Sequence, residues 1–148
     1  MGSSSAFTVG LLKTLYALEG KVISKEELYK SAIHMEQNLI KENVGSQDQV
    51  WAACGGFNVI RFMKNGEIIV EPIIMSQYNR KKFENKFMIF FTGISRYASE
   101  IAKEQINNIN NNTYELSCMN DLVEEAISEA YLDIPVKKII NLFSNFLS

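Results

Sequence analysis

Apolar residues recur at the spacing of α-helices through the first forty positions of the chain. The first stripe predicts a helix that follows the serines at 3–5, which are good helix caps, and that ends at Gly20. Its apolar positions are Phe7, Leu11, Leu15 and Leu18. A second helix is predicted to begin at a capping box, in which Ser24 is followed three residues later by Glu27. The buried face predicted for this second helix consists of Leu28, Ala32, Met35 and Leu39.

The middle of the chain changes to the pattern of β-strands. The glycine pair at 55–56 is predicted to end a short helix before a strand over 57–63. Asn65-Gly66 predicts a hairpin turn, and the return strand is predicted over 68–74, with a proline near its end. Residues 78–86 are polar and predict a surface loop. The almost wholly apolar run from Phe87 to Phe91 predicts a central strand that is buried on both faces.

The last third of the chain returns to helical spacing. A helix is predicted to start near Ile94, and an asparagine-rich break follows at 107–112. Two further helices are predicted over 114–132 and 135–147, and the second of them is apolar on most sides. Together these elements predict an α+β fold of two layers, in which helices pack on one face of a mixed or antiparallel sheet.

The composition of the 148 residues is that of one globular domain. The chain is 47% hydrophobic and carries 17 acidic against 15 basic side chains, which excludes a disordered tail and argues against binding nucleic acid through its phosphates. No apolar run reaches the roughly 18 residues of a membrane span, and the first five residues lack the basic start of a signal peptide. Cys54 and Cys118 are predicted to be free thiols. We therefore expect a soluble cytoplasmic protein with no nucleic-acid and no membrane partner.

Three short polar features carry candidate chemistry. The Gly-Ser-Ser-Ser run at 2–5 leads into a helix, where unpaired N–H groups and hydroxyls favour an anion, although a plain serine cap or an expression-tag remnant has the same sequence. Glu36 lies at the edge of the buried helix face, so its carboxylate needs a cation, a metal ion or water. Asp48 is predicted in the first turn of a short helix, where the helix dipole favours any acidic residue. His34, the only histidine, is predicted to lie on the surface.

The order of these features resembles that of the GHMP small-molecule kinases. The similar segments are Gly2-Ser3-Ser4-Ser5-Ala6 before a helix, Glu36 on the next helix, Gly45-Ser46-Gln47-Asp48-Gln49, and Gly55-Gly56-Phe57-Asn58. A later segment, 91–99, is similar to one of the sugar-kinase branch that includes the D-glycero-D-manno-heptose 7-phosphate kinases. The resemblance extends from the first glycine to about Gln105, with the motifs in the family's order.

The resemblance implies an ATP-dependent kinase that transfers a phosphoryl group to a hydroxyl of a sugar or sugar phosphate. The nucleotide-binding residues that it implies are Gly2, Ser3, Ser4 and Ser5. It also implies that Ser4 and Glu36 hold magnesium, and that Asp48 is the catalytic residue beside the acceptor hydroxyl, as a general base or an orienting charge. These roles suit phosphoryl transfer, in which positioning and charge neutralisation supply most of the catalysis.

The chain also departs from the family pattern. The family's strand-rich beginning, the first half of its phosphate loop and its late glycine-rich motif are absent, so the chain is expected to be a fragment. Residues 1–86 would then be a remnant of the N-terminal domain, and residues 87–148 the start of the C-terminal domain with a helical tail. Such a fragment is expected to show little or no turnover. The alternative hypothesis is a catalytically silent module that forms a homo-oligomer through the apolar helix over 135–147.

Overall fold

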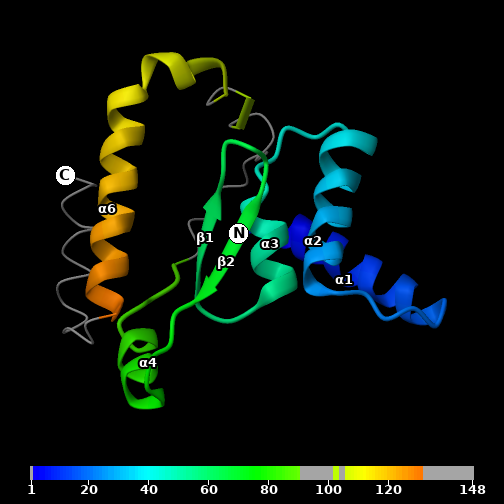
Figure 1. Ribbon diagram of the computed structural model, residues 1–148, viewed down its shortest axis with the longest axis horizontal. Coiled ribbons are helices and arrows are strands. Elements are labelled where there is room, and N and C mark those ends of the chain that lie inside the picture. Colours follow the sequence, from blue (N-terminus) through cyan, green and yellow to red (C-terminus); the bar gives the residue numbers. More distant parts are fainter. Residues whose placement is uncertain (1, 91–101, 104–105, 132–148) are drawn as a thin grey trace. The chain divides into compact units, whose positions relative to one another are not determined.

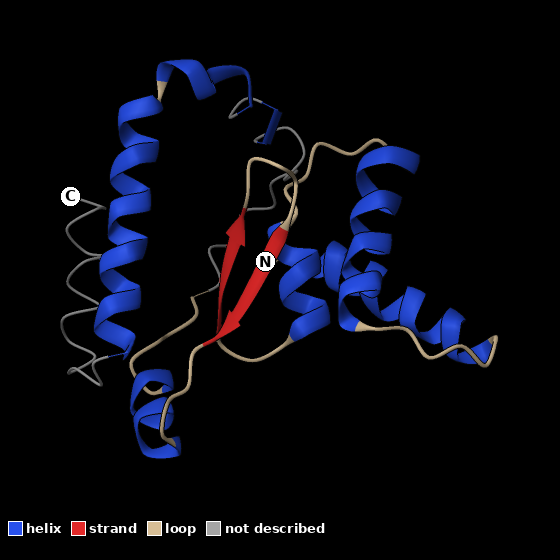
Figure 2. Ribbon diagram, viewed as in Figure 1, coloured by secondary structure: helices blue, strands red, loops and turns tan. Residues whose placement is uncertain are grey.

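A computed structural model describes residues 2–90, 102–103 and 106–131 of the chain (Figure 1). These residues form helices and one two-stranded antiparallel sheet, so the predicted mixture of α and β structure is confirmed (Figure 2). They divide into two compact units, one containing the residues up to Gly56 with 102–103 and 106–107, the other containing 57–90 and 108–131. The helices predicted from Ile94 and over 135–147 begin or lie outside the described residues.

Helix α1 opens the first unit and spans Ser3–Leu18. Its N-cap is Gly2, whose φ of 59° lies in the left-handed region that favours glycine. The serines that were predicted as caps therefore occupy the first turn of the helix instead of the cap position. At the other end the helix stops before Gly20, which has a φ of 69°, as predicted.

The face of α1 that packs on the neighbouring helices is not its most apolar stripe. Its buried side chains are those of Ser5, Val9 and Leu12. By contrast Phe7 and Leu18 are 70% and 79% exposed, and the other two members of the predicted stripe, Leu11 and Leu15, are also exposed. This rotation follows from a polar contact, because the Ser5 hydroxyl donates a hydrogen bond of 2.9 Å to a buried carboxylate of the next helical segment.

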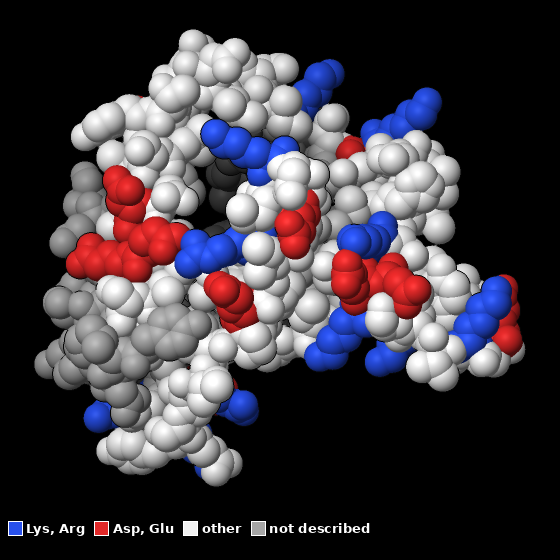
Figure 3. All heavy atoms as spheres, in the orientation of Figure 1, with Lys and Arg blue, Asp and Glu red and all other residues white. Residues whose placement is uncertain are grey.

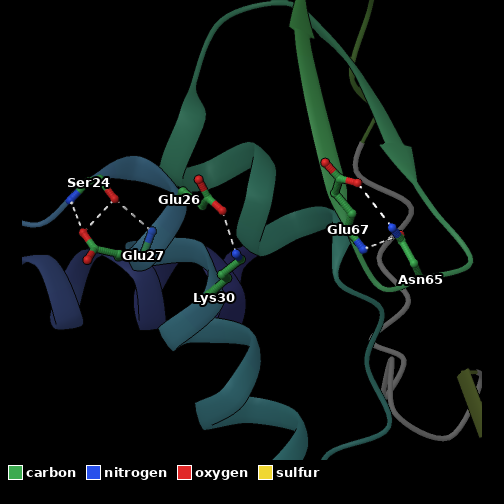
Figure 4. A network of polar contacts seen from close by, with 6 residues as sticks. All are labelled: Ser24, Glu26, Glu27, Lys30, Asn65 and Glu67. Atoms are coloured by element: carbon green, nitrogen blue, oxygen red, sulfur yellow. Dashed lines mark hydrogen bonds and ion pairs between the residues drawn. The ribbon is translucent and has the colours of Figure 1, made fainter.

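Helix α2 spans Lys25–Ile33 and begins at the predicted capping box (Figure 4). The Ser24 hydroxyl accepts a hydrogen bond from the Glu27 backbone N–H (3.1 Å), and the Glu27 carboxylate accepts one from the Ser24 backbone N–H (3.1 Å). One turn later, Lys30 pairs with Glu26 at 2.6 Å. Hydrogen bonds from the Ser24 side chain and backbone lower the pKa of Glu27, since they favour its charged form.

Removing this cap should destabilise the first unit in a pH-dependent way. We expect Ser24→Ala to lower the free energy of unfolding by about 1 kcal/mol at neutral pH, the usual cost of a lost N-cap. Because the pKa of Glu27 is lowered in the folded chain, its contribution is present above the unfolded value of about 4.3 and is lost as the pH falls through the folded value. Urea denaturation at pH 7 and pH 3 measures both effects. The exposed Thr14→Ala variant should lack the pH dependence, and a loss of equal size at both pH values would contradict this account.

A π-helical segment, η1 (His34–Leu39), continues directly from α2. Its wider winding is seen in the backbone, where the Ile40 N–H donates to the Met35 carbonyl five residues earlier (2.9 Å). The predicted buried face assumed 3.6 residues per turn, and it fails at Leu39, which is 60% exposed. Glu36 is instead turned into the interior by this segment, while His34 lies on the surface as predicted.

Helix α3 spans Gln47–Cys54 and completes the first unit. It packs against α1 and α2, and its fully buried side chains are Gln49 and Val50. The core that the three helices share consists of Val9, Leu12, Leu28 and Ala32, with further half-buried apolar residues around it. Gly55 and Gly56 follow with φ values of 63° and 79° and end the helix, as the glycine pair predicts.

The second unit begins with the predicted hairpin. Strand β1 (Asn58–Phe62) pairs antiparallel with β2 (Ile68–Pro72), with Ile60 opposite Val70. The turn has Gly66 at a φ of 84°, and the Asn65 side chain accepts a hydrogen bond from the Glu67 N–H (3.0 Å; Figure 4). The Asn-Gly signal and the proline at the strand end therefore fix this hairpin locally.

Two predictions for the segment after the hairpin are wrong. Residues 78–86 were predicted as a polar loop, but α4 spans Gln77–Glu84, capped by the Ser76 hydroxyl and supported by the pair Arg80–Glu84 at 3.1 Å. Residues 87–90 are not a buried strand: they have no regular secondary structure and no strand partner among the described residues, and Ile89 is 88% exposed. An apolar run alone does not specify a central strand, because the strand also needs neighbours on both sides.

The second unit ends with helix α6 (Thr113–Tyr131), after a 3₁₀ turn at 109–111 in the predicted asparagine-rich break. Arg61 of β1 pairs with Glu124 of α6 at 2.6 Å and with Glu71 of β2 at 3.2 Å. Acidic and basic side chains are mixed over the face drawn in Figure 3. The two cysteines are free thiols, as predicted. Among the described residues no helix is long and apolar enough to cross a membrane.

Candidate functional site

A cavity of about 420 Å³ lies in the first unit, at the beginning of α1. Its walls come from the start of α1, from the loop that precedes α3, and from the first turn of α3. The residues that line it are Gly2, Ser3, Ser4, Ser5, Asn43, Val44, Gly45, Gln47, Asp48 and Ala102. The fold thus brings all four residues of the predicted nucleotide-binding run and the predicted catalytic aspartate to one cavity.

The start of α1 gives the cavity an electrostatic preference for anions. The first intrahelical bond at this end runs from the Ala6 N–H to the Gly2 carbonyl (2.9 Å), so the amides of the residues before Ala6 have no partner within the helix. These N–H groups and the positive end of the helix dipole favour negative charge. Two exposed hydroxyls, those of Ser3 and Ser4, stand beside them in the wall of the cavity.

Asp48 lies directly against Gly2. A Cβ atom added at Gly2 would lie 3.2 Å from Asp48 Oδ2 and 3.3 Å from its Cγ, which is tighter than nearly all Cβ contacts. The aspartate sits in the first turn of α3 and is exposed to the cavity. Position 2 therefore favours glycine for two reasons, its left-handed φ and the carboxylate beside it.

Glu36 is only 3% exposed and does not itself line the cavity, but it is hydrogen-bonded to Ser5, which does. Its Oε2 atom accepts hydrogen bonds from the Ser5 hydroxyl (2.9 Å) and from the Gln49 side-chain amide. Its Oε1 atom is buried and has no hydrogen-bond partner among the residues that the structure describes. None of the ion pairs formed by the described residues includes this carboxylate. The sequence left its direction open until the resemblance favoured the interior, and the structure places it there.

A buried carboxylate with one open oxygen fits a hard divalent cation. Burying such a charge without a counter-charge is costly, and magnesium accepts oxygen ligands while keeping several waters and taking others from phosphate. The described residues contain no group of three or more acidic, histidine or cysteine side chains that could hold a metal by themselves. The available oxygen atoms therefore fit a magnesium ion that is bound jointly by the protein and a phosphate, with Glu36 as the charged protein ligand. Ser5 contacts this carboxylate, while Ser4, the predicted metal ligand, lines the cavity.

Two buried residues of this arrangement make contacts that the sequence did not predict. Gln49 follows the predicted aspartate directly but, unlike it, is fully buried. The other, Ser5, was grouped with the nucleotide-binding run, although its spacing from Val9 and Leu12 places it on the buried face. A third side chain, that of Gln37, fixes the loop before α3 by donating to the Val44 carbonyl (3.0 Å) and to a serine hydroxyl at the helix start (3.1 Å).

Comparison with known proteins finds a family model that matches residues 1–56 and a similar protein. Residues 1–56 match the family model described as the GHMP kinases N terminal domain. Over 127 residues the chain is 28% identical to the D-glycero-alpha-D-manno-heptose 7-phosphate kinase of Campylobacter jejuni. That alignment covers 86% of this chain and 37% of the relative. No solved structure gives a significant match.

The matched segment coincides with the three packed helices α1 to α3 and η1, and it contains the residues of the candidate site except one lining alanine. The resemblance noted in the sequence is thereby confirmed for this segment. Residues 1–56 are thus similar to the N-terminal domain of the GHMP kinases.

Proposed function

We propose that this chain carries the phosphate-binding part of an ATP-dependent kinase that phosphorylates a sugar or a sugar phosphate. The observation that carries the proposal is the cavity at the start of α1, where anion-binding amides face Asp48 within the segment that matches the kinase family. The chain spans about 37% of the relative's length. We therefore propose the activity for a whole kinase of this kind, of which the chain matches only a part. The relative's name favours a phosphorylated heptose as the acceptor class.

In this proposal each side chain of the site has a defined task. The amides and hydroxyls of residues 2–4 bind the phosphates of ATP at the positive end of α1. Glu36 and Ser4 would hold magnesium, which when bound neutralises phosphate charge. Asp48, which lines the cavity beside Gly2, orients the acceptor hydroxyl and receives its proton.

The test is a calorimetric titration of the chain with ATP, in magnesium and again in EDTA, together with one glycine variant. We expect ATP to bind more tightly with magnesium, and Gly2→Ala to weaken binding by about tenfold or more, equivalent to at least about 1.4 kcal/mol. The reason is that the new methyl meets Asp48 and forces the left-handed backbone into strain.

Gly10→Ala is the matched control for this prediction. Gly10 lies in the same helix, and nothing lies within 4 Å of an added Cβ. This change should leave ATP binding intact and stabilise the helix by up to about 1 kcal/mol. If Gly2→Ala bound ATP as well as the unaltered chain, the cavity would not be the phosphate site.

A second candidate function is that of a homo-oligomeric interaction module, and the exposed stripe of α1 favours it. Four large apolar side chains, those of Phe7, Leu11, Leu15 and Leu18, face outward from one helix, and exposed apolar patches are typical of interaction surfaces.

We expect sedimentation velocity at tens of micromolar to detect association of the unaltered chain. The double change Leu11→Gln and Leu15→Gln should shift the chain toward monomer, whereas Val22→Gln, at a fully exposed position outside the stripe, should not. A monomer at all concentrations would contradict this second candidate.

A further inference from the structure

The fully buried amide of Gln49 contacts the candidate cation ligand from a third element of the first unit. Its Nε2 group donates to Glu36 Oε2, the same atom that accepts the hydrogen bond from Ser5. Glu36 thus accepts hydrogen bonds from α1 and from α3 through one oxygen, and its other oxygen has no partner in the described part of the chain. The three residues belong to α1, η1 and α3, so the arrangement exists only when the three segments are packed.

The orientation of the amide follows from charge. A carboxylate oxygen can only accept, so the Gln49 donor group must face it, and this leaves the amide oxygen pointing away. That oxygen is also buried and has no hydrogen-bond partner among the described residues. An apolar side chain would fill the same volume on α3 without an orphaned acceptor, as Val50 does next to it. The amide is therefore poorly explained by packing alone.

We propose that Gln49 is a positioning residue, which together with Ser5 fixes Glu36 through Oε2 and leaves Oε1 as the oxygen offered to a divalent cation. The inference rests on the proposed function, in which Glu36 holds magnesium beside bound ATP. Residues that orient a metal-binding side chain commonly change metal affinity by 10- to 100-fold when they are replaced. Gln49 does not line the cavity, so it acts through Glu36 and not by touching nucleotide.

The test uses the ratio of two ATP dissociation constants for the full chain, measured by calorimetry in EDTA and in magnesium. Gln49→Met keeps the length and volume of the side chain but removes the donor. We expect it to lower the magnesium-dependent gain in ATP affinity at least tenfold, while the dissociation constant in EDTA stays unchanged. Gln49→Asn, which keeps the amide but is too short to reach Glu36, should behave in the same way. It serves as the second variant if the methionine variant does not fold.

Two controls separate positioning from a structural role. Val50→Ala removes buried volume from the same helix and removes no hydrogen bond to Glu36, so it should lower stability and leave the magnesium-dependent gain intact. In a Glu36→Gln background, Gln49→Met should have no further effect on that gain, because both changes act on the same ligand.

Each outcome decides between the two proposals. If the unaltered chain shows a magnesium-dependent gain that Gln49→Met or Gln49→Asn leaves unchanged, the positioning role is wrong and the proposed function stands. Equal weakening in EDTA and magnesium also overturns it, because a structural defect acts on both. If the unaltered chain shows no magnesium-dependent ATP binding, both proposals fail together.

Discussion

Glu36→Gln should raise the stability of the chain in the absence of magnesium and abolish any stabilisation of the chain by magnesium. The carboxylate is 3% exposed and has no cationic partner among the described residues, and a buried ion without a counter-charge carries a penalty of several kcal/mol. The glutamine oxygen can accept the same two hydrogen bonds, from Ser5 and Gln49. We expect a gain of about 1 kcal/mol or more, which raises Tm by roughly 2–8 °C for a domain of 60–250 residues.

The variant should also differ from the unaltered chain in how much magnesium stabilises it. With ATP present, magnesium that binds the folded chain at ten times its Kd should stabilise the unaltered protein by about 1.4 kcal/mol. The Glu36→Gln variant should lose this effect, because its neutral amide no longer offers a charged oxygen. Thermal unfolding in EDTA and in magnesium with ATP measures both quantities.

The matched control is Glu26→Gln, at an exposed carboxylate of the same unit that pairs with Lys30. Surface pairs of this kind contribute little, so the variant should keep the magnesium response and change Tm only slightly. If Glu36→Gln were strongly destabilising in EDTA, the glutamate would be a purely structural anchor between the helices.

The parts of the fold that the sequence predicted correctly are those with a complete local signal. The capping box at Ser24, the Asn65-Gly66 turn and the glycine pair at 55–56 each fix the backbone through atoms only a few residues apart. The family motifs were informative for a similar reason, since the motifs that contain residues 2–5 and Asp48 are short and occur in the family's order. These two were predicted separately and meet in one cavity.

The wrong predictions share one physical cause. At these positions the structure is determined by packing partners that are distant in the sequence. Helix α1 turns Ser5 inward because a carboxylate thirty-one positions later accepts its hydrogen bond, and this leaves the most apolar stripe in solvent. The run at 87–90 reads like a buried strand but has no strand beside it among the described residues. Gln49 was missed for the same reason, because its neighbour Asp48 carries the charge while the glutamine carries the long-range contact.

Leu28→Ala should cost the first unit about 2–5 kcal/mol, the largest stability loss that we predict for this chain. Leu28 is 4% exposed and belongs to the core shared by the three helices. The packed helices leave the neighbouring side chains little room to move into the space that the smaller alanine would leave. Leu39 belongs to the same predicted apolar face, yet the π-helical winding of η1 turns it out to solvent. Leu39→Ala should therefore change stability by no more than about 0.5 kcal/mol.

Urea denaturation of both leucine variants, followed by circular dichroism, tests the winding directly. A regular α-helix would keep Leu39 on the side of Leu28 and Met35, because 3.6 residues per turn return it to that face. The π-helical segment shifts the face by its extra residue and brings Glu36 inward in its place. Equal losses in the two variants would show that the segment is an ordinary α-helix, and the buried position of Glu36 would then lose its structural basis. A large loss confined to Leu28→Ala is the result that ties the wider turn to the buried position of Glu36.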